Sequence, residues 1–231
     1  LIKECFPQAR VARMDLDTTR SRLNYEQILH DFQQGETDIL VGTQMVTKGL
    51  DFDRVNVVGI LNADSMLNQP DFRSYERAFQ MMAQVAGRAG RRSRQGRVIL
   101  QTRDVESPVV KQVVENDYES MFHDQMQERT LFNFPPYCRL IYVYVKHRDE
   151  RVVEKLSHEL SALMRQVFAH RVMGPDTPFV SRVQLMYIRK VVLKLELSAP
   201  MNEARKRLAQ IQRHLLSQPQ YHSAQVYYDV E

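Results

Sequence analysis

The sequence contains only two cysteines, Cys5 and Cys138, among its 231 residues. Two thiols fit a reducing compartment, and they cannot by themselves supply the four ligands of a structural zinc site. The chain also lacks any run of about 18 uncharged apolar residues, which a membrane-spanning helix needs, and it has no N-terminal signal pattern. We therefore expect a cytoplasmic protein with no membrane partner and no metal site within this sequence.

Two motifs that handle nucleotide phosphates are also missing. The sequence has no glycine-rich loop of the form GxxxxGK[ST] and no acidic box that would hold Mg²⁺. Without these groups the chain alone cannot bind the β- and γ-phosphates of a nucleotide properly. Because the first residue is leucine rather than methionine, we interpret the sequence as a fragment of a longer protein.

The charges that are present cluster strongly. The net charge is only +4, but residues 77–103 carry seven arginines and no acid, and residues 161–215 carry ten bases against three acids. Two such clusters suggest two surfaces that face polyanions. For the second cluster, a solvated surface in which the charges balance is an equally good interpretation.

The clearest chemical signal is the stretch QVAGRAGR at residues 84–91. The preceding residues 72–85 keep apolar side chains on one side, which predicts a helix that ends at Gly87. Arg88 and Arg91 then lie in a short turn without acids to pair with them. A guanidinium is a flat fork of donors that stays charged, so it suits the oxygens of a phosphoryl group in transfer.

A second stretch, ILVGTQMVTKGLDF at residues 39–52, reads as an apolar strand that ends in a polar loop. Together the two stretches resemble motifs V and VI of the superfamily 2 helicases. The segments PDFRSYER at 70–77 and MDLDTT at 14–19 narrow this resemblance to the PriA-type replication-restart helicases. One departure is Leu50, where the family pattern has a polar or aromatic residue.

The resemblance assigns three residues of the first stretch to catalysis. Arg91 would be the arginine finger, Arg88 a second contact to the γ-phosphate, and Gln84 a polar positioning residue. Each would act on a nucleotide held mainly by the other helicase lobe, which would carry the glycine-rich loop. Since the stretch has no acids, a ligand role is favoured over a structural ion pair.

The resemblance also assigns the polar loop that follows residue 42. Thr43 and Gln44 would contact the phosphates of the translocated strand, and Gly49 and Asp51 would face the nucleotide. Capping of a strand end by Thr43 and of a turn by Asp51 are the structural alternatives.

Strands that alternate with helices predict an α/β fold with a parallel sheet in the first part of the chain. We interpret residues 1–105 as a second RecA-like helicase lobe, with ligands at the carboxyl ends of its strands. Residues 106–135 would form a helical linker, which Pro135-Pro136 ends because a proline pair cannot continue a helix.

Residues 136–231 follow the order β-α-β-β-α-β of a ferredoxin-like sandwich, in which the first and third strands are central. The first strand is expected at 139–146, and the second and third at about 179–187 and 189–197. Asp149 can cap the first helix, whose expected apolar positions are 153, 156, 160, 163 and 167. The resemblance agrees, because PriA-type proteins end in a small α/β domain. The uncovered sheet face would then show Tyr142 and Tyr144 beside Lys190 and Lys194. Aromatic rings beside lysines suit the bases and phosphates of single strands, whereas packing of the tyrosines within the protein is the alternative.

Taken whole, the resemblance implies the C-terminal part of an ATP-dependent 3′→5′ DNA helicase. It would recognise stalled or branched replication forks and initiate primosome assembly. ATP and Mg²⁺ would bind with the missing lobe, and zinc would belong to the longer protein only. The implied partners are single-stranded and forked DNA, the single-stranded DNA-binding protein and primosome assembly proteins.

Two alternative functions remain. Another superfamily 2 motor, such as an RNA helicase or a chromatin-type translocase, would share residues 84–91 but not the 70–77 segment or the ferredoxin-like tail. A non-enzymatic adaptor would bind single-stranded nucleic acid through the uncovered sheet face and would not need Arg91.

Overall fold

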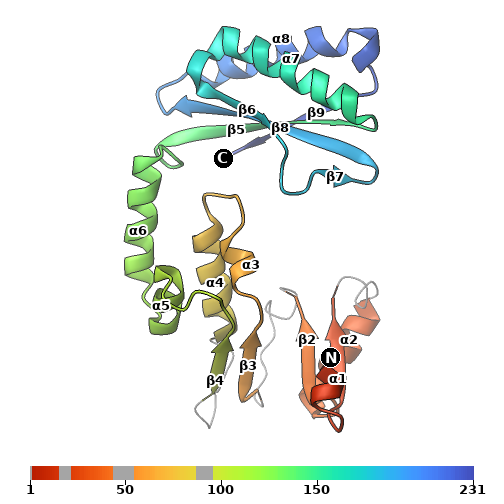
Figure 1. Cartoon of the computed structure of the whole chain (residues 1–231), viewed down its shortest axis with the longest axis vertical. Coiled ribbons are helices and arrows are strands. Elements are labelled where there is room, and N and C mark those ends of the chain that lie inside the picture. The colour runs from red at the N-terminus through yellow and green to blue at the C-terminus, as the bar shows by residue number, and fades with distance from the viewer. Residues whose placement is uncertain (1, 16–21, 44–54, 87–95) are drawn as a thin grey trace. The chain divides into compact units, whose positions relative to one another are not determined.

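The computed structural model describes residues 2–15, 22–43, 55–86 and 96–231 (Figure 1). The chain forms two compact units, Leu1–His123 and Asp124–Glu231. Both contain helices and strands, which confirms the predicted α/β class. None of the helices in the described ranges combines the length and hydropathy needed to cross a bilayer. The three-part division expected at residues 105 and 135 stays a prediction.

The first unit contains short strands between helices. Its elements are α1 (Ile2–Cys5), β1 (Val11–Met14), α2 (Arg22–Gln34), β2 (Ile39–Gly42), β3 (Val57–Ile60), α3 (Asp64–Leu67), α4 (Ser74–Ala86), β4 (Arg97–Leu100), α5 (Pro108–Glu115) and α6 (Tyr118–Leu131), the last of which continues into the second unit. β1 pairs with β2 and β3 pairs with β4, each pair parallel. Parallel pairing is what the alternation of strands and helices predicted.

The apolar face of α4 is the centre of the described core of the first unit. Phe79 and Met82, which the helical pattern placed on one side, are buried against α3, α5 and the start of α6. The parallel strands are less buried than their unbroken apolar runs predicted. Val57 and Ile99 are more than half exposed, because the described strands pair only two by two.

The second unit is a five-stranded antiparallel sheet with two helices. Its elements are β5 (Cys138–His147), α7 (Glu150–Phe168), β6 (Val172–Asp176), β7 (Arg182–Val183), β8 (Met186–Glu196), α8 (Met201–Leu216) and β9 (Gln225–Val230), with short 3₁₀ turns at Ala169–Arg171 and Pro219–Tyr221. The strand order is β6-β8-β5-β9, and the short β7 adds to β8. Both helices lie on one face of the sheet (Figure 1). This confirms the ferredoxin-like topology with β5 and β8 at its centre.

The predicted strand at residues 179–187 is wrong. The second strand of the sandwich is instead β6. Its Gly174 and Pro175 are residues typical of a turn. They are tolerated because β6 lies at the edge of the sheet, where a proline removes no necessary hydrogen bond. Within the predicted range, Arg182–Val183 forms the short β7, which pairs in a tight hairpin with Met186 and Tyr187 at the start of β8. Gln184 and Leu185 at its tip have φ of +49° and +65°, as two-residue hairpin turns require.

The core of the second unit lies between the sheet and its two helices. Ile141, Val143 and Val145 of β5 face α7 and α8, together with alternate residues of β8. The side chain of Asp149 accepts a hydrogen bond from the backbone N–H of Arg151 at 2.8 Å, which confirms the predicted cap of α7.

The buried stripe of α7 is shifted slightly from the predicted one. It consists of Val153, Leu156, Leu160, Met164 and Phe168, whereas the predicted position 167 is nearly half exposed. A strict alternation of three- and four-residue steps assumes about 3.5 residues per turn, whereas a straight helix has about 3.6. The buried stripe therefore moves ahead of the predicted positions along the helix.

We expect Leu160→Ala to destabilise the second unit by about 2–5 kcal/mol, because Leu160 is 1% exposed and its truncation leaves a cavity. Val167→Ala on the exposed side of the same helix is the matched control, with an expected change within about 0.5 kcal/mol. Urea unfolding monitored by circular dichroism measures both. Equal effects would contradict the assignment of the core stripe.

An ion pair in the first unit predicts a dependence of stability on pH. Arg10 donates to the Asp38 carboxylate from Nε at 2.9 Å and from Nη2 at 2.7 Å, and its backbone N–H donates at 2.8 Å. These hydrogen bonds, the side-chain one first, lower the pKa of Asp38 to about 2. Since the folded pKa lies below the unfolded value of about 4, the stabilisation is present above pH 4 and is lost as pH falls towards 2.

Asp38→Asn should therefore lower Tm at neutral pH, and the difference from the natural sequence should shrink between about pH 4 and pH 2. Thermal unfolding at a series of pH values measures this difference. A gap in Tm that stays constant down to pH 2 would contradict the role of the ion pair.

Candidate nucleic-acid interface

Most of the predicted helicase-motif residues lie outside the described residues, and their roles stay predictions: Gln44, Gly49, Asp51, Arg88 and Arg91. Thr43 and Gln84 are described and both are exposed. Thr43 directly follows β2, at the carboxyl end of the β1–β2 pair, where α/β sheets bind ligands. Gln84 lies in the last turn of α4.

The segment that precedes α4 is fixed by a carboxylate. Asp71 accepts a hydrogen bond from the backbone N–H of Arg73 at 2.8 Å and one from Nη1 of Arg77 at 2.7 Å. The guanidinium of Arg73 lies 4.9 Å from the centre of the Phe72 ring. Part of the segment 70–77 therefore anchors the start of α4, while Phe79 and Met82 anchor its middle.

The carboxyl ends of β3 and β4 are joined by a second carboxylate, which the sequence did not indicate. Asp64 accepts hydrogen bonds from Oγ1 of Thr102 at 2.7 Å and from the backbone N–H of Arg103 at 3.0 Å. The Thr102 hydrogen bond is the main cause of a lowered pKa at Asp64. Among the described residues, no group of three or more His, Cys, Asp or Glu side chains is arranged to hold a metal ion.

The sheet face away from α7 and α8 carries the predicted aromatic and basic residues. Side chains alternate along a strand, and the odd-numbered residues of β5 point into the core, so Tyr142 and Tyr144 lie on the other face. Lys190 pairs directly with Tyr144, and its Nζ lies 5.2 Å from the centre of the Tyr142 ring. The structure therefore brings these three predicted residues together.

Two further residues, Tyr227 and Lys146, belong to this group and were not predicted from the sequence. Tyr227 of β9 stacks on Tyr144 with ring centres 4.9 Å apart, and Nζ of Lys146 lies 4.5 Å from the centre of the Tyr227 ring. We call Tyr142, Tyr144 and Tyr227, with Lys146 and Lys190, the tyrosine ladder. The alternation of side chains along β5 could have indicated that Lys146 lies on this face. Tyr227 could not be placed from the sequence, because its position depends on the pairing of β5 with β9.

Lys194, the fourth residue predicted on this face, contacts the segment that precedes β5. Its Nζ donates to the carbonyl oxygen of Phe132 at 2.9 Å and lies 4.2 Å from the centre of the Phe134 ring. Packing within the protein was left open only for the tyrosines, so this contact of Lys194 was not predicted. Its predicted role in DNA binding is not tested by this contact.

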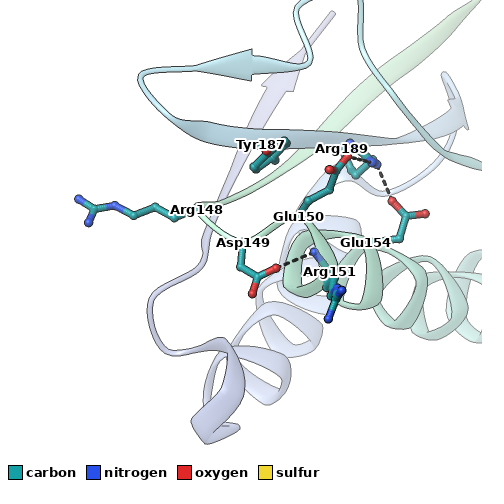
Figure 2. Close-up of a pocket in the computed structure, with 7 residues that line it drawn as sticks. All are labelled: Arg148, Asp149, Glu150, Arg151, Glu154, Tyr187 and Arg189. Atoms are coloured by element: carbon teal, nitrogen blue, oxygen red, sulfur yellow. Dashed lines mark hydrogen bonds and ion pairs between the residues drawn. The ribbon is translucent and has the colours of Figure 1, made fainter.

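Several bases of the second basic cluster are paired within the unit. Arg189 donates to Glu154 at 2.6 Å and to Glu150 at 3.1 Å, beside a cavity of about 660 Å³ whose lining holds three arginines and three acids (Figure 2). Arg171 pairs with Glu196 at 2.9 Å, and Arg207 pairs with Glu203 at 3.0 Å. For these arginines the charge-balanced interpretation is the better one.

The balanced charge around this cavity leaves little to attract a polyanion. Both glutamates belong to the N-terminal turns of α7 and point at Arg189, which is 13% exposed, while Arg148 extends away from them (Figure 2). We therefore place the candidate interface on the tyrosine ladder, on the opposite face of the sheet from α7.

Comparison with known proteins identifies both parts of the sequence. Residues 2–93 match the helicase conserved C-terminal domain. The chain is 40% identical over 191 residues to the replication restart protein PriA of Synechocystis sp., an alignment that covers 82% of this chain and 23% of the relative. It is 36% identical over 211 residues to the replication restart protein PriA of Bacillus subtilis. This alignment covers 90% of this chain and 26% of the relative.

The chain thus spans about a quarter of the length of these relatives. An alignment of 211 residues also extends well beyond the matched helicase domain, so the similarity includes the second unit. These findings confirm the resemblance inferred from residues 14–19, 39–52, 70–77 and 84–91. The chain belongs to the PriA-type helicases of superfamily 2, as a segment that contains their helicase C-terminal domain.

Proposed function

We propose that this chain is part of an ATP-dependent 3′→5′ DNA helicase that recognises stalled or branched replication forks and initiates primosome assembly. The observation that carries the proposal is the similarity to PriA proteins over 82–90% of the chain. A motor of another superfamily 2 family would share the helicase domain at 2–93 and would not match the ferredoxin-like unit. The proposal therefore favours the replication-restart activity over a generic nucleic-acid motor.

In this proposal Arg91 and Arg88 act on the γ-phosphate of ATP. The reaction develops charge on the phosphoryl oxygens, and a rigid guanidinium that meets this charge lowers the barrier. Support comes from α4, which ends just before these arginines and is held by its buried face and by Asp71. A fixed helix limits how far Gln84 can move.

The chain itself does not provide the groups that hold ATP and Mg²⁺. Its sequence has neither the phosphate-cradling loop nor the acidic box, so both would bind with a lobe outside this chain, as would zinc in the longer protein. DNA would contact Thr43 and Gln44 in the first unit and the tyrosine ladder in the second. The single-stranded DNA-binding protein and primosome assembly proteins are the proposed partners, and the cytoplasm is the proposed location.

The purified 231-residue chain should show no ATP hydrolysis above background, with or without DNA, because these phosphate-binding groups are absent. Release of inorganic phosphate, measured with a phosphate-binding fluorescent probe, tests this. Hydrolysis stimulated by DNA would show that the chain contains a complete nucleotide site and would contradict the proposal.

In the longer protein, Arg91→Ala should reduce kcat for DNA-stimulated ATP hydrolysis by about 10³-fold and leave ATP binding nearly unchanged. Arg91→Lys should restore little of this activity, because an ammonium does not reproduce the flat fork of donors. Steady-state ATPase assays and nucleotide-binding titrations separate the two effects.

Arg97→Ala is the matched control, since Arg97 is an exposed arginine on β4 of the same unit. Its kcat should stay within about twofold of the natural protein, as for a surface charge away from the site. An Arg91→Lys variant with normal turnover would refute the role of Arg91 as a finger.

A further inference from the structure

Two rings of the tyrosine ladder stack across neighbouring strands. Tyr144 and Tyr227 are directly paired residues of neighbouring antiparallel strands. Their ring centres are 4.9 Å apart and their planes differ by 12°. This separation equals the spacing of about 4.8 Å between strands, so the two rings stack face to face across the strands. Each of these two rings therefore covers part of one face of the other.

Other members of the ladder also lie beside or over a ring. Tyr142 lies beside Tyr144, with ring centres 6.3 Å apart and planes tilted by 35°. Nζ of Lys190 lies over the Tyr142 ring and Nζ of Lys146 lies over the Tyr227 ring. A nucleobase needs a ring face to stack on. To stack here, a base would have to displace a tyrosine or a lysine.

The two lysines are well suited to bind phosphate. Attraction between an ammonium and the electron-rich ring face holds each lysine over the ladder. A ring face fills none of the strong acceptor positions around an ammonium, so its N–H donors can still turn towards phosphate oxygens. The fixed position also reduces the side-chain entropy lost on binding.

The charges around the ladder favour a narrow binding strip. Lys146 and Lys190 lie on the two inner strands, β5 and β8. The two outer strands, β6 and β9, each carry an aspartate on this face. Asp176 of β6 pairs with Lys190, and Asp229 of β9 pairs with Tyr142. The positive potential is therefore concentrated between two flanking carboxylates, along the direction of the inner strands.

We propose that the tyrosine ladder binds the sugar–phosphate backbone of DNA through Lys146 and Lys190, without stacking on bases. This inference rests on the proposed function and specifies which part of the DNA the second unit contacts. Backbone contact carries no sequence information and does not require unpaired bases. The ladder would therefore accept the duplex arms of a branched DNA as well as its single strands.

The test compares three DNA probes of equal length with the whole chain: a single strand, the same backbone with abasic sites, and a duplex. Fluorescence anisotropy gives the affinity at several salt concentrations. We expect the abasic strand to bind as tightly as the normal strand, whereas stacking would weaken it by about fivefold or more for each stacked base.

Lys146→Ala and Lys190→Ala should each reduce the slope of log K against log salt, by about 0.7 on single strands and 0.9 on duplex. Lys155→Ala on α7 removes the same charge from the helix-covered side of the sheet and is the matched control. It should leave both slopes unchanged. Asp229→Asn should tighten binding, because it removes a flanking negative charge.

The tyrosines should act through the lysines that they hold. Tyr142→Phe keeps the ring and should bind as the natural chain does, whereas Tyr142→Ala should resemble a weaker form of Lys190→Ala. Since a truncated tyrosine can disturb the sheet, circular dichroism checks the fold of each variant. The lysine variants and Tyr142→Phe keep the test valid if Tyr142→Ala unfolds.

Two results would overturn the inference in different ways. If the abasic strand binds about fivefold or more weakly and the lysine variants keep the normal salt slope, the ladder stacks on bases. Backbone binding is then wrong, but the proposed DNA-binding function stands. If Lys146→Glu and Lys190→Glu together leave the affinity for every probe unchanged, the ladder does not bind DNA, and that part of the proposed function fails as well.

Discussion

Along β5, the side chains alternate between two very different surroundings, and the second unit depends on this alternation. Ile141, Val143 and Val145 are at most 2% exposed against α7 and α8. Burying them fixes the register of the central strand, because a shift by one residue would move every apolar side chain to the other face. The same constraint forces Tyr142 and Tyr144 onto the uncovered face, where β8 and β9 add Lys190 and Tyr227. Formation of the core and assembly of the tyrosine ladder are therefore one event.

Much of this could be predicted from the sequence because it depends on local patterns. The alternation along β5, the Asp149 cap and the stripe of α8 at Ala204, Leu208, Ile211 and Leu215 are all periodic or short-range signals. The strand β6 was missed because Gly174 and Pro175 favour a turn locally, and only its place at the sheet edge makes them acceptable. Tyr227 was missed for a related reason, since its stacking on Tyr144 depends on a pairing between distant strands.

Composition was a weaker guide to the basic surface. Ten bases against three acids in residues 161–215 suggested a polyanion-binding face. Arg189, however, pairs with Glu150 and Glu154, which precede that window and lie on the neighbouring helix. Charge counted in a sequence window cannot include partners that the fold brings from outside the window. The lysines of the ladder differ because each ammonium lies over an aromatic ring.

In the first unit, the described residues anchor α4, the helix that precedes the predicted catalytic residues. Phe79 and Met82 bury one face of α4, and Asp71 fixes its start.

The proposed helicase function is tested most directly by measuring whether the longer protein that contains this sequence unwinds a forked DNA. We expect ATP-dependent displacement of a strand in the 3′→5′ direction, with forked DNA preferred over an RNA duplex. Unwinding of RNA in preference to DNA, or no unwinding of a forked DNA when ATP is hydrolysed, would contradict it.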